Sequence, residues 1–201
     1  YEDNNILIAD KLSGVTSEGL TAELCASGSC FAVHRLDRNT QGLIVFAKTA
    51  QAEAELLSAF KERKIQKTYL ALCKNNFKSK SAVLTAYLVK DDKNSLVKVY
   101  GGERKGAVKI ITEYAVVEGR GDIALAEIKL HTGKTHQIRA HTAYIGCPVL
   151  GDNKYGDTDL NKKYRVARQC LVAKKLQFNL DGELNYLNGK VFESRFNPET
   201  R

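Results

Sequence analysis

Short runs of β-branched and other apolar residues recur along the chain, and they constrain its fold more than any other feature of the sequence. Runs of this kind, bounded by turn-forming residues, predict β-strands. They occupy residues 5–9, 43–47, 68–72, 82–89, 107–117, 123–130 and 170–178. Gly-Arg-Gly-Asp separates two of these runs, at 119–122, and such a turn is typical of an antiparallel hairpin. The pattern therefore favours a sheet that is largely antiparallel.

Two segments have a helical pattern instead. Residues 49–64 begin with Thr49, a good N-cap, carry glutamates early and lysine and arginine late, as the helix dipole favours. Residues 135–145 begin with Thr135 as a second candidate cap and stop before Gly146. We therefore expect an α+β fold in which residues 1–201 form a single domain, with a largely antiparallel central sheet and few helices.

Charge and composition indicate the kind of partner. The chain has 31 Lys and Arg against 23 Asp and Glu, a formal net charge of +8 and a pI near 9.2, which favours a polyanion such as nucleic acid. No apolar run approaches the roughly 18 residues of a membrane span, and the first residues lack the basic region of a secretory signal. We therefore expect a cytoplasmic protein. Its cysteines are odd in number and form no Cys-x-x-Cys pair, which predicts reduced thiols (Cys25, Cys30, Cys73, Cys147 and Cys170).

One carboxylate, Asp37, stands among cationic neighbours in HRLDRNTQGL (34–43). A calcium loop starting at Asp37 would need a glutamate where Lys48 stands, and an aspartyl phosphatase would need a second Asp where Asn39 stands. HTGKT (131–135) resembles part of a phosphate-binding loop, but Ile128 replaces the required glycine. These three alternatives are rejected.

An ionised aspartate beside arginines remains. Nearby cations stabilise the charged form of a carboxyl group, so Asp37 is suited to be a nucleophile rather than a general acid. The decapeptide alone equally fits an ordinary surface ion pair, and by itself it favours that simpler interpretation. His131, His136 and His141 are spaced five residues apart, which points successive side chains in different directions on a helix or strand. No metal site is therefore expected, and these histidines are predicted to face the surface or RNA.

The wider pattern changes the interpretation of Asp37. HRLDRNTQGLIVFAKT (34–49) closely resembles the catalytic motif of the RluA-type pseudouridine synthases, and KTYLALC (67–73) and LHTGKTHQIRAHTAYIGCPVLGDNKYG (130–156) resemble two further motifs of that family, in the same order. Three ordered motifs are a much more specific signal than one. The resemblance implies a pseudouridine synthase fold with an active-site cleft across the central sheet. It also implies an enzyme that isomerises uridine in RNA to pseudouridine without a cofactor or metal.

The resemblance also implies roles for individual residues. Asp37 would be the catalytic nucleophile, acting at ribose C1′ or at the uracil ring; Arg139 would pair with Asp37; and Tyr69 would contact the target base. Arg35 would fill the space left when the nucleotide is flipped out of the RNA. The residues expected to bind RNA are Arg35, His34, Arg38, Thr40, Lys134, His136 and Gln137.

Several questions stay open at the level of sequence. The substrate is expected to be structured ribosomal or transfer RNA, and the protein is expected to be a monomer. A non-catalytic RNA-binding or RNA-chaperone domain with the same fold is the alternative, although binding alone does not require a nucleophile such as Asp37. Many relatives carry a small RNA-binding domain ahead of the catalytic one. No such segment precedes residues 5–9 and the chain has no Met, so we expect either a shorter enzyme or a trimmed chain.

Overall fold

The structure is a computed structural model that describes residues 1–25, 30–91, 93 and 95–200. The chain divides into two compact units. The first contains Tyr1–Thr68 and Val172–Asn197, and the second contains Tyr69–Leu171 and the residues from Pro198 onward. Both combine strands with a few helices, and each is described separately below.

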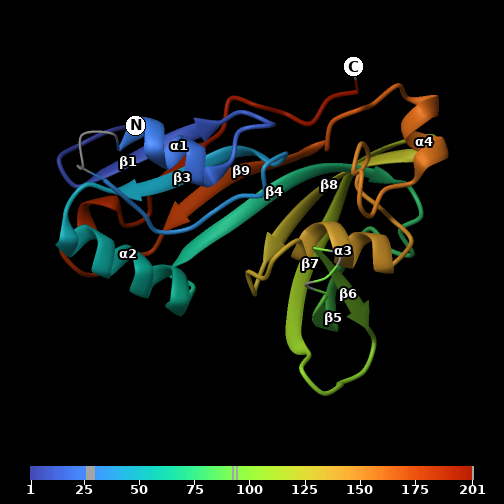
Figure 1. The fold of residues 1–201 in the computed structure, drawn as a ribbon, viewed down its shortest axis with the longest axis horizontal. Coiled ribbons are helices and arrows are strands. Elements are labelled where there is room, and N and C mark those ends of the chain that lie inside the picture. The colour runs from blue at the N-terminus through green and yellow to red at the C-terminus, as the bar shows by residue number, and fades with distance from the viewer. Residues whose placement is uncertain (26–29, 92, 94, 201) are drawn as a thin grey trace. The chain divides into compact units, whose positions relative to one another are not determined.

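The first unit combines a sheet with a few helices (Figure 1). Strand β1 (Ile6–Lys11) pairs antiparallel with β3 (Gln41–Ala47), and β3 pairs parallel with β9 (Leu171–Phe178). Strand β9 is followed in the sheet by β4 (Ile65–Lys74), whose first residues belong to this unit. The short strands β2 (Phe31–Ala32) and β10 (Val191–Glu193) pair with β3 and β9. The helices are α1 (Ser17–Leu24), α2 (Ala50–Glu62) and the 3-10 turn η1 (Asn185–Leu187).

Helix α2 forms for the reasons that its sequence suggests. The Thr49 side chain accepts a hydrogen bond from the Ala52 backbone N–H at 3.1 Å, so the predicted cap is confirmed. The helix ends at Arg63, which adopts a left-handed conformation. Its buried face, which includes Leu56, joins an apolar core with β1, β3 and β9. Burial of this core is the main favourable term that holds the unit together.

The second unit contains the long hairpins. Its sheet runs β4, β8 (Ile123–Leu130), β7 (Val108–Arg120), β5 (Ser81–Asp91) and β6 (Leu96–Tyr100), and the pairs from β8 to β6 are antiparallel. The predicted turn joins β7 to β8, with Arg120 opposite Ile123 and Gly121 at a φ of +63°. Glycine adopts this left-handed conformation without steric cost. Helix α3 (Gln137–Tyr144) contacts β6 and β7, and α4 (Thr158–Lys163) follows it in the chain (Figure 1).

The expected fold class is confirmed, because the structure is α+β with a large, mostly antiparallel sheet. The predicted cap of α3 is wrong. The cap position is His136, in a left-handed conformation, and no side chain caps the helix there. The Gln137 side chain instead accepts a hydrogen bond from the Lys134 backbone N–H at 3.1 Å, which makes Thr135 part of a turn before the helix.

The prediction that all cysteines are reduced is wrong for one pair. Cys25 and Cys30 form a disulfide, and their Cα atoms are 5.1 Å apart, within the range that a disulfide requires. The absence of a Cys-x-x-Cys motif does not exclude such a pair, because these two cysteines are five positions apart in the sequence. Cys73, Cys147 and Cys170 are free and buried, as small hydrophobic residues often are.

Among the helices that the described part of the chain forms, none has the length and apolar character needed to cross a membrane.

Candidate active site

Asp37 lies in the first unit, half-buried in the loop between β2 and β3. The loop is tightened by a hydrogen bond from the Thr40 backbone N–H to the Asp37 carbonyl at 3.1 Å. On the other side, Ser17 at the start of α1 bonds both the carbonyl and the N–H of Leu36, at 2.9 and 3.0 Å. The backbone that carries Asp37 is therefore held in place both before and after the carboxylate.

The His34 ring makes both a hydrogen bond and an aromatic contact within this unit. Its Nε2 accepts a hydrogen bond from the Val45 backbone N–H at 2.9 Å, and the ring packs on Phe60 with centroids 4.5 Å apart. Burial, with a smaller effect from the nearby Lys67 charge, lowers the pKa of His34 to about 3. His34 is therefore neutral at pH 7, and its Nε2 is the acceptor of the Val45 hydrogen bond. The sequence predicted an RNA contact here but not this structural role.

The other residues predicted to bind RNA from this motif differ in exposure. Arg35 is exposed and pairs with the exposed Glu18 at 2.9 Å, an interaction that contributes little to stability and is easily exchanged. Arg38 is also exposed, and its Nε donates to the Gly14 carbonyl at 2.9 Å. Thr40 is buried, with 3% of its surface exposed. The two arginines are thus the members of this group that present charge to solvent.

Tyr69 and Arg139 belong to the second unit. Tyr69 lies in β4 and is 7% exposed, and Arg139 lies in α3 and is 5% exposed. Asp37 belongs to the other unit, and its pairing with Arg139 stays a prediction.

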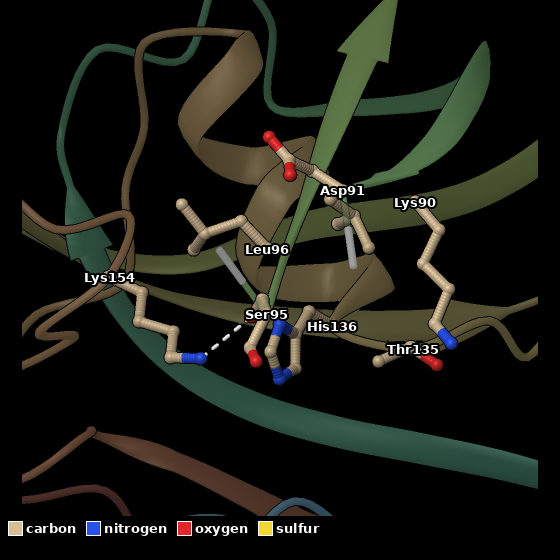
Figure 2. Close-up of a pocket in the computed structure, with 8 residues that line it drawn as sticks. Lys90, Asp91, Ser95, Leu96, Thr135, His136 and Lys154 are labelled. Carbon is tan, nitrogen blue, oxygen red and sulfur yellow. Dashed lines mark hydrogen bonds between the residues drawn. The ribbon is translucent and has the colours of Figure 1, made fainter. Parts of the chain in front are cut away.

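A hollow of about 250 Å³ lies in the second unit, and Figure 2 shows the side chains around it. Lys90 and residues of β6 line it together with Thr135, His136 and Lys154. Lys154 donates to the Ser95 carbonyl at 2.7 Å. His136, one of the predicted RNA-binding residues, therefore faces a small concave surface that also contains two lysines.

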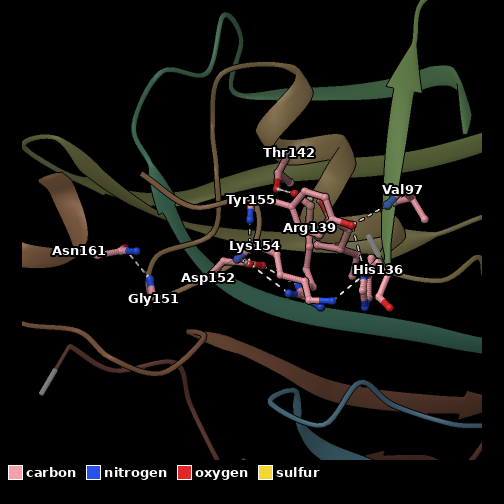
Figure 3. A network of polar contacts seen from close by, with 11 residues as sticks. Val97, His136, Arg139, Thr142, Gly151, Asp152, Lys154, Tyr155 and Asn161 are labelled. Carbon is pink, nitrogen blue, oxygen red and sulfur yellow. Dashed lines mark hydrogen bonds and ion pairs between the residues drawn. The ribbon is translucent and has the colours of Figure 1, made fainter. Parts of the chain in front are cut away.

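Arg139 is bound by a carboxylate that the sequence did not single out, as Figure 3 shows. Its Nε donates to Asp152 Oδ2 at 2.6 Å and its Nη2 to Asp152 Oδ1 at 3.0 Å. Oδ1 also accepts the backbone N–H groups of Lys154 and Tyr155. Burial by itself raises the pKa of Asp152, but the Arg139 guanidinium and these two N–H groups outweigh it and hold the pKa below its usual range. The pair is ionised and fixes the plane of the guanidinium.

Tyr155 links this ion pair to the lining of the hollow. Its hydroxyl accepts a hydrogen bond from the Val97 backbone N–H at 2.9 Å and bonds His136 Nδ1 at 2.9 Å. The Arg139 guanidinium lies 5.3 Å from the centre of the Tyr155 ring. Arg139, Asp152, Tyr155 and His136 are thus parts of one polar network in the second unit (Figure 3).

Gln137 holds the loop before α3, and both polar atoms of its side chain are hydrogen-bonded. Its oxygen accepts from Thr132 Oγ1 and the Lys134 N–H, and its nitrogen donates to the Ile111 carbonyl and Thr112 Oγ1. The side chain is 2% exposed. Gln137 therefore fixes the loop that carries the exposed Lys134, and a contact of Gln137 with RNA stays a prediction.

The three histidines of this region have different environments. His131 Nε2 pairs with Glu113 at 2.8 Å near the surface. His141 is 1% exposed and bonds Thr112 through Nδ1 at 2.9 Å, and burial lowers its pKa to about 4. The prediction that His141 faces the surface or RNA is therefore wrong, because its position on α3 turns it into the interior. Within the described residues, no group of three or more His, Cys, Asp or Glu side chains is arranged to hold a metal ion.

Comparison with known proteins identifies the class. The sequence model of a family described as RNA pseudouridylate synthase matches residues 6–144. Ribosomal large subunit pseudouridine synthase C of Rickettsia bellii is 33% identical over an alignment that covers 94% of this chain and 69% of that protein. The synthase C of Vibrio cholerae is 32% identical over 89% of this chain and 60% of the relative. The solved structure of human RNA Pseudouridylate Synthase Domain Containing 1 has a TM-score of 0.80 at 26% identity, with 91% of this chain and 78% of that one covered.

The chain belongs to the RNA pseudouridylate synthase family, and the RluA-type membership predicted from its motifs is confirmed. It spans only part of some curated relatives: 60% of the Vibrio cholerae protein and 52% of its Vibrio vulnificus counterpart.

Proposed function

We propose that this chain isomerises uridine to pseudouridine in ribosomal RNA, with Asp37 as the nucleophile. The observation that supports this most is that the family match at 6–144 includes Asp37, Tyr69 and Arg139. A target in the large subunit is favoured over transfer RNA because curated relatives are named as ribosomal large subunit synthases. The site is proposed to need no metal or cofactor, and the protein is proposed to be cytoplasmic, monomeric and a single catalytic domain.

The proposed mechanism assigns each residue one task. The target uridine leaves its stack, at a cost of a few kcal/mol, and contact with Tyr69 offsets part of that cost. In the C1′ route, the Asp37 carboxylate attacks ribose C1′ as the N-glycosidic bond breaks, and the uracil turns in place. Its C5 then attacks C1′, which forms the carbon–carbon bond and releases the Asp37 carboxylate. C5 finally loses its proton and N1 takes one up, so that the product is an isomer of the substrate. Arg139 orients the nucleophile. For that task a guanidinium must have a fixed plane, and the two hydrogen bonds to Asp152 supply one.

The experiment is a conversion assay with the full chain and in vitro transcribed large-subunit RNA, followed by carbodiimide mapping of pseudouridine. Formation at one or a few uridines is the expected result, and transfer RNA transcripts serve as the competing substrate. Binding of RNA without any pseudouridine would favour the alternative, a non-catalytic RNA-binding domain. Conversion of transfer RNA alone would contradict the proposed substrate class while leaving the chemistry intact.

RNA binding is expected to weaken with salt, and Lys134 provides a specific test. Each neutralised phosphate releases about 0.7–0.9 counterion, so Lys134→Ala should reduce the log–log salt slope of RNA binding by about 1. Lys134 is exposed, and it lies in the loop just before α3. Fluorescence anisotropy of a labelled stem-loop measures the slope.

Lys175 is the matched control for Lys134. Its ammonium already pairs with the Glu193 carboxylate at 3.0 Å, and this pairing makes it less available to bind a phosphate. Lys175→Ala should leave the slope near that of the wild type. Equal slopes for all three proteins would show that Lys134 does not contact the RNA backbone.

A further inference from the structure

Lys11, the last residue of β1, is a buried lysine outside the predicted site. It is 1% exposed, and its ammonium donates to three backbone carbonyls: Leu12 at 3.1 Å, Val15 at 2.8 Å and Arg38 at 3.0 Å. Burial of a lysine is rare and unfavourable unless its charge is compensated. Such an arrangement therefore indicates a specific role.

The three acceptors show which form of Lys11 the structure holds. An ammonium has three N–H donors, one for each carbonyl, whereas a neutral amine has only two and would turn its lone pair toward the third oxygen. Hydrogen bonds from a charged donor are also stronger than neutral ones. The geometry thus fits a protonated Lys11 that joins the turn after β1 to the loop before β3.

That loop is the one that carries Asp37. The Arg38 carbonyl, one residue after Asp37, accepts from both Lys11 and the Gly14 N–H, at 3.0 Å each. Ser13 Oγ donates to the Asn39 carbonyl at 3.1 Å. With the bonds between Ser17 and Leu36, the segment 11–17 holds the backbone on both sides of Asp37. Lys11 is the charged member of this set and also attracts the Asp37 carboxylate.

We propose that Lys11 is a positioning residue for catalysis, whose buried ammonium holds the Asp37 loop in its reactive geometry. The role rests on the proposed function of Asp37 as the nucleophile. Lys11 touches neither RNA nor the reacting atoms in this scheme. It acts through the Arg38 carbonyl and through its charge, and a small displacement of a nucleophile is enough to slow a reaction strongly.

The protonation of Lys11 gives the role a pH dependence. Burial lowers the pKa of Lys11 to about 8, and the Asp37 carboxylate opposes that shift. Two other charged groups lie near it in the chain: the Arg38 guanidinium bonds the Gly14 carbonyl, and the Asp10 carboxylate bonds Ser194 and the Arg195 N–H. As pH rises through about 8, Lys11 loses its third donor and its charge, so the rate of the chemical step should fall.

The test replaces Lys11 by Met, which has a similar length but no donor or charge. Single-turnover rates with saturating enzyme should fall about tenfold or more, whereas RNA affinity should stay within about twofold of the wild type. The fall in rate above pH 8 should be absent from Lys11→Met. Hydrogen exchange at the Gly14 and Thr40 amides should be about tenfold faster, and this readout does not depend on activity.

Lys48→Met is the matched control. Lys48 follows β3 at the other end of the β1–β3 pair, and its ammonium also donates to a backbone carbonyl, that of Asp3, at 2.8 Å and to Glu2 at 2.6 Å. It should keep the wild-type rate, the wild-type pH profile and slow exchange at Gly14 and Thr40. A folded Lys11→Met with a wild-type rate, or one that keeps the alkaline fall in rate, would overturn the proposal. If the wild-type chain makes no pseudouridine, the proposed function fails. Unchanged hydrogen exchange in Lys11→Met would separately refute the claim that Lys11 holds the Asp37 loop in place.

Discussion

Replacement of Asp37 by Asn is expected to abolish pseudouridine formation, with a loss of about four orders of magnitude or more in single-turnover rate. Asn has almost the same shape as Asp but lacks the charged oxygen that would attack the substrate. The hydrogen bonds that fix the loop at this point use the backbone, including the bond from the Thr40 N–H to the Asp37 carbonyl, and they survive the change. The variant should therefore fold.

RNA affinity separates chemistry from binding in this experiment. Asp37→Asn should bind a large-subunit stem-loop as tightly as the wild type and with the same salt slope, because the nucleophile contacts no phosphate in the proposed scheme. Carbodiimide mapping measures the product and anisotropy measures the affinity. Turnover near that of the wild type would rule out Asp37 as the nucleophile, and a parallel loss of rate and affinity would indicate a binding role instead.

The fold could be predicted to a large extent because long elements carry strong local signals. The apolar runs predicted β1, β3, β4, β5, β7, β8 and β9, and Thr49 predicted the start of α2. Elements such as β6, α1 and α4 were missed. They are short, and α1 has only Ser17 buried, so tertiary contacts rather than a periodic apolar face determine them.

The site was predicted less completely, since burial decides the role of a charged residue and a single sequence does not display burial. The motifs singled out Arg139 but not Asp152, although a buried arginine needs a carboxylate. Lys11 follows the apolar run at 5–9, and the sequence shows no partner for it because its acceptors are backbone carbonyls. His141 was placed at the surface because only its spacing was considered.

The buried ion pair gives the second large effect. Asp152→Asn should lower the free energy of unfolding by about 3–5 kcal/mol, because it removes the charge of a buried carboxylate that accepts two hydrogen bonds from Arg139 and two from backbone N–H groups. The Asp152 side chain is fully buried and that of Arg139 is 6% exposed. Urea denaturation followed by circular dichroism measures the change.

Arg139→Lys tests the geometry of the pair instead. Lysine keeps the charge but cannot form both hydrogen bonds to Asp152, so the catalytic rate should fall more than RNA affinity does.

An exposed pair of the same geometry provides the control for Asp152. Arg120 donates to Glu118 through Nε at 2.8 Å and through Nη2 at 2.9 Å, but both side chains are at least half exposed. Glu118→Gln should therefore change stability very little. If Asp152→Asn were equally mild, the Arg139–Asp152 pair would not be a determinant of stability.

Acid denaturation tests the Asp152 pair by a second route, with a sign that follows from its pKa. The pKa of Asp152 is lower in the folded chain than its ordinary value, despite burial, because Arg139 and two backbone N–H groups stabilise the carboxylate. A carboxyl group of this kind contributes stability that is fully present above its unfolded pKa, about 3.9, and is lost as pH falls below that value. Wild-type stability should therefore drop more steeply below about pH 4 than that of Asp152→Asn, which has no carboxyl group to protonate. Equal slopes would mean that the ionisation of Asp152 contributes nothing to the folded state.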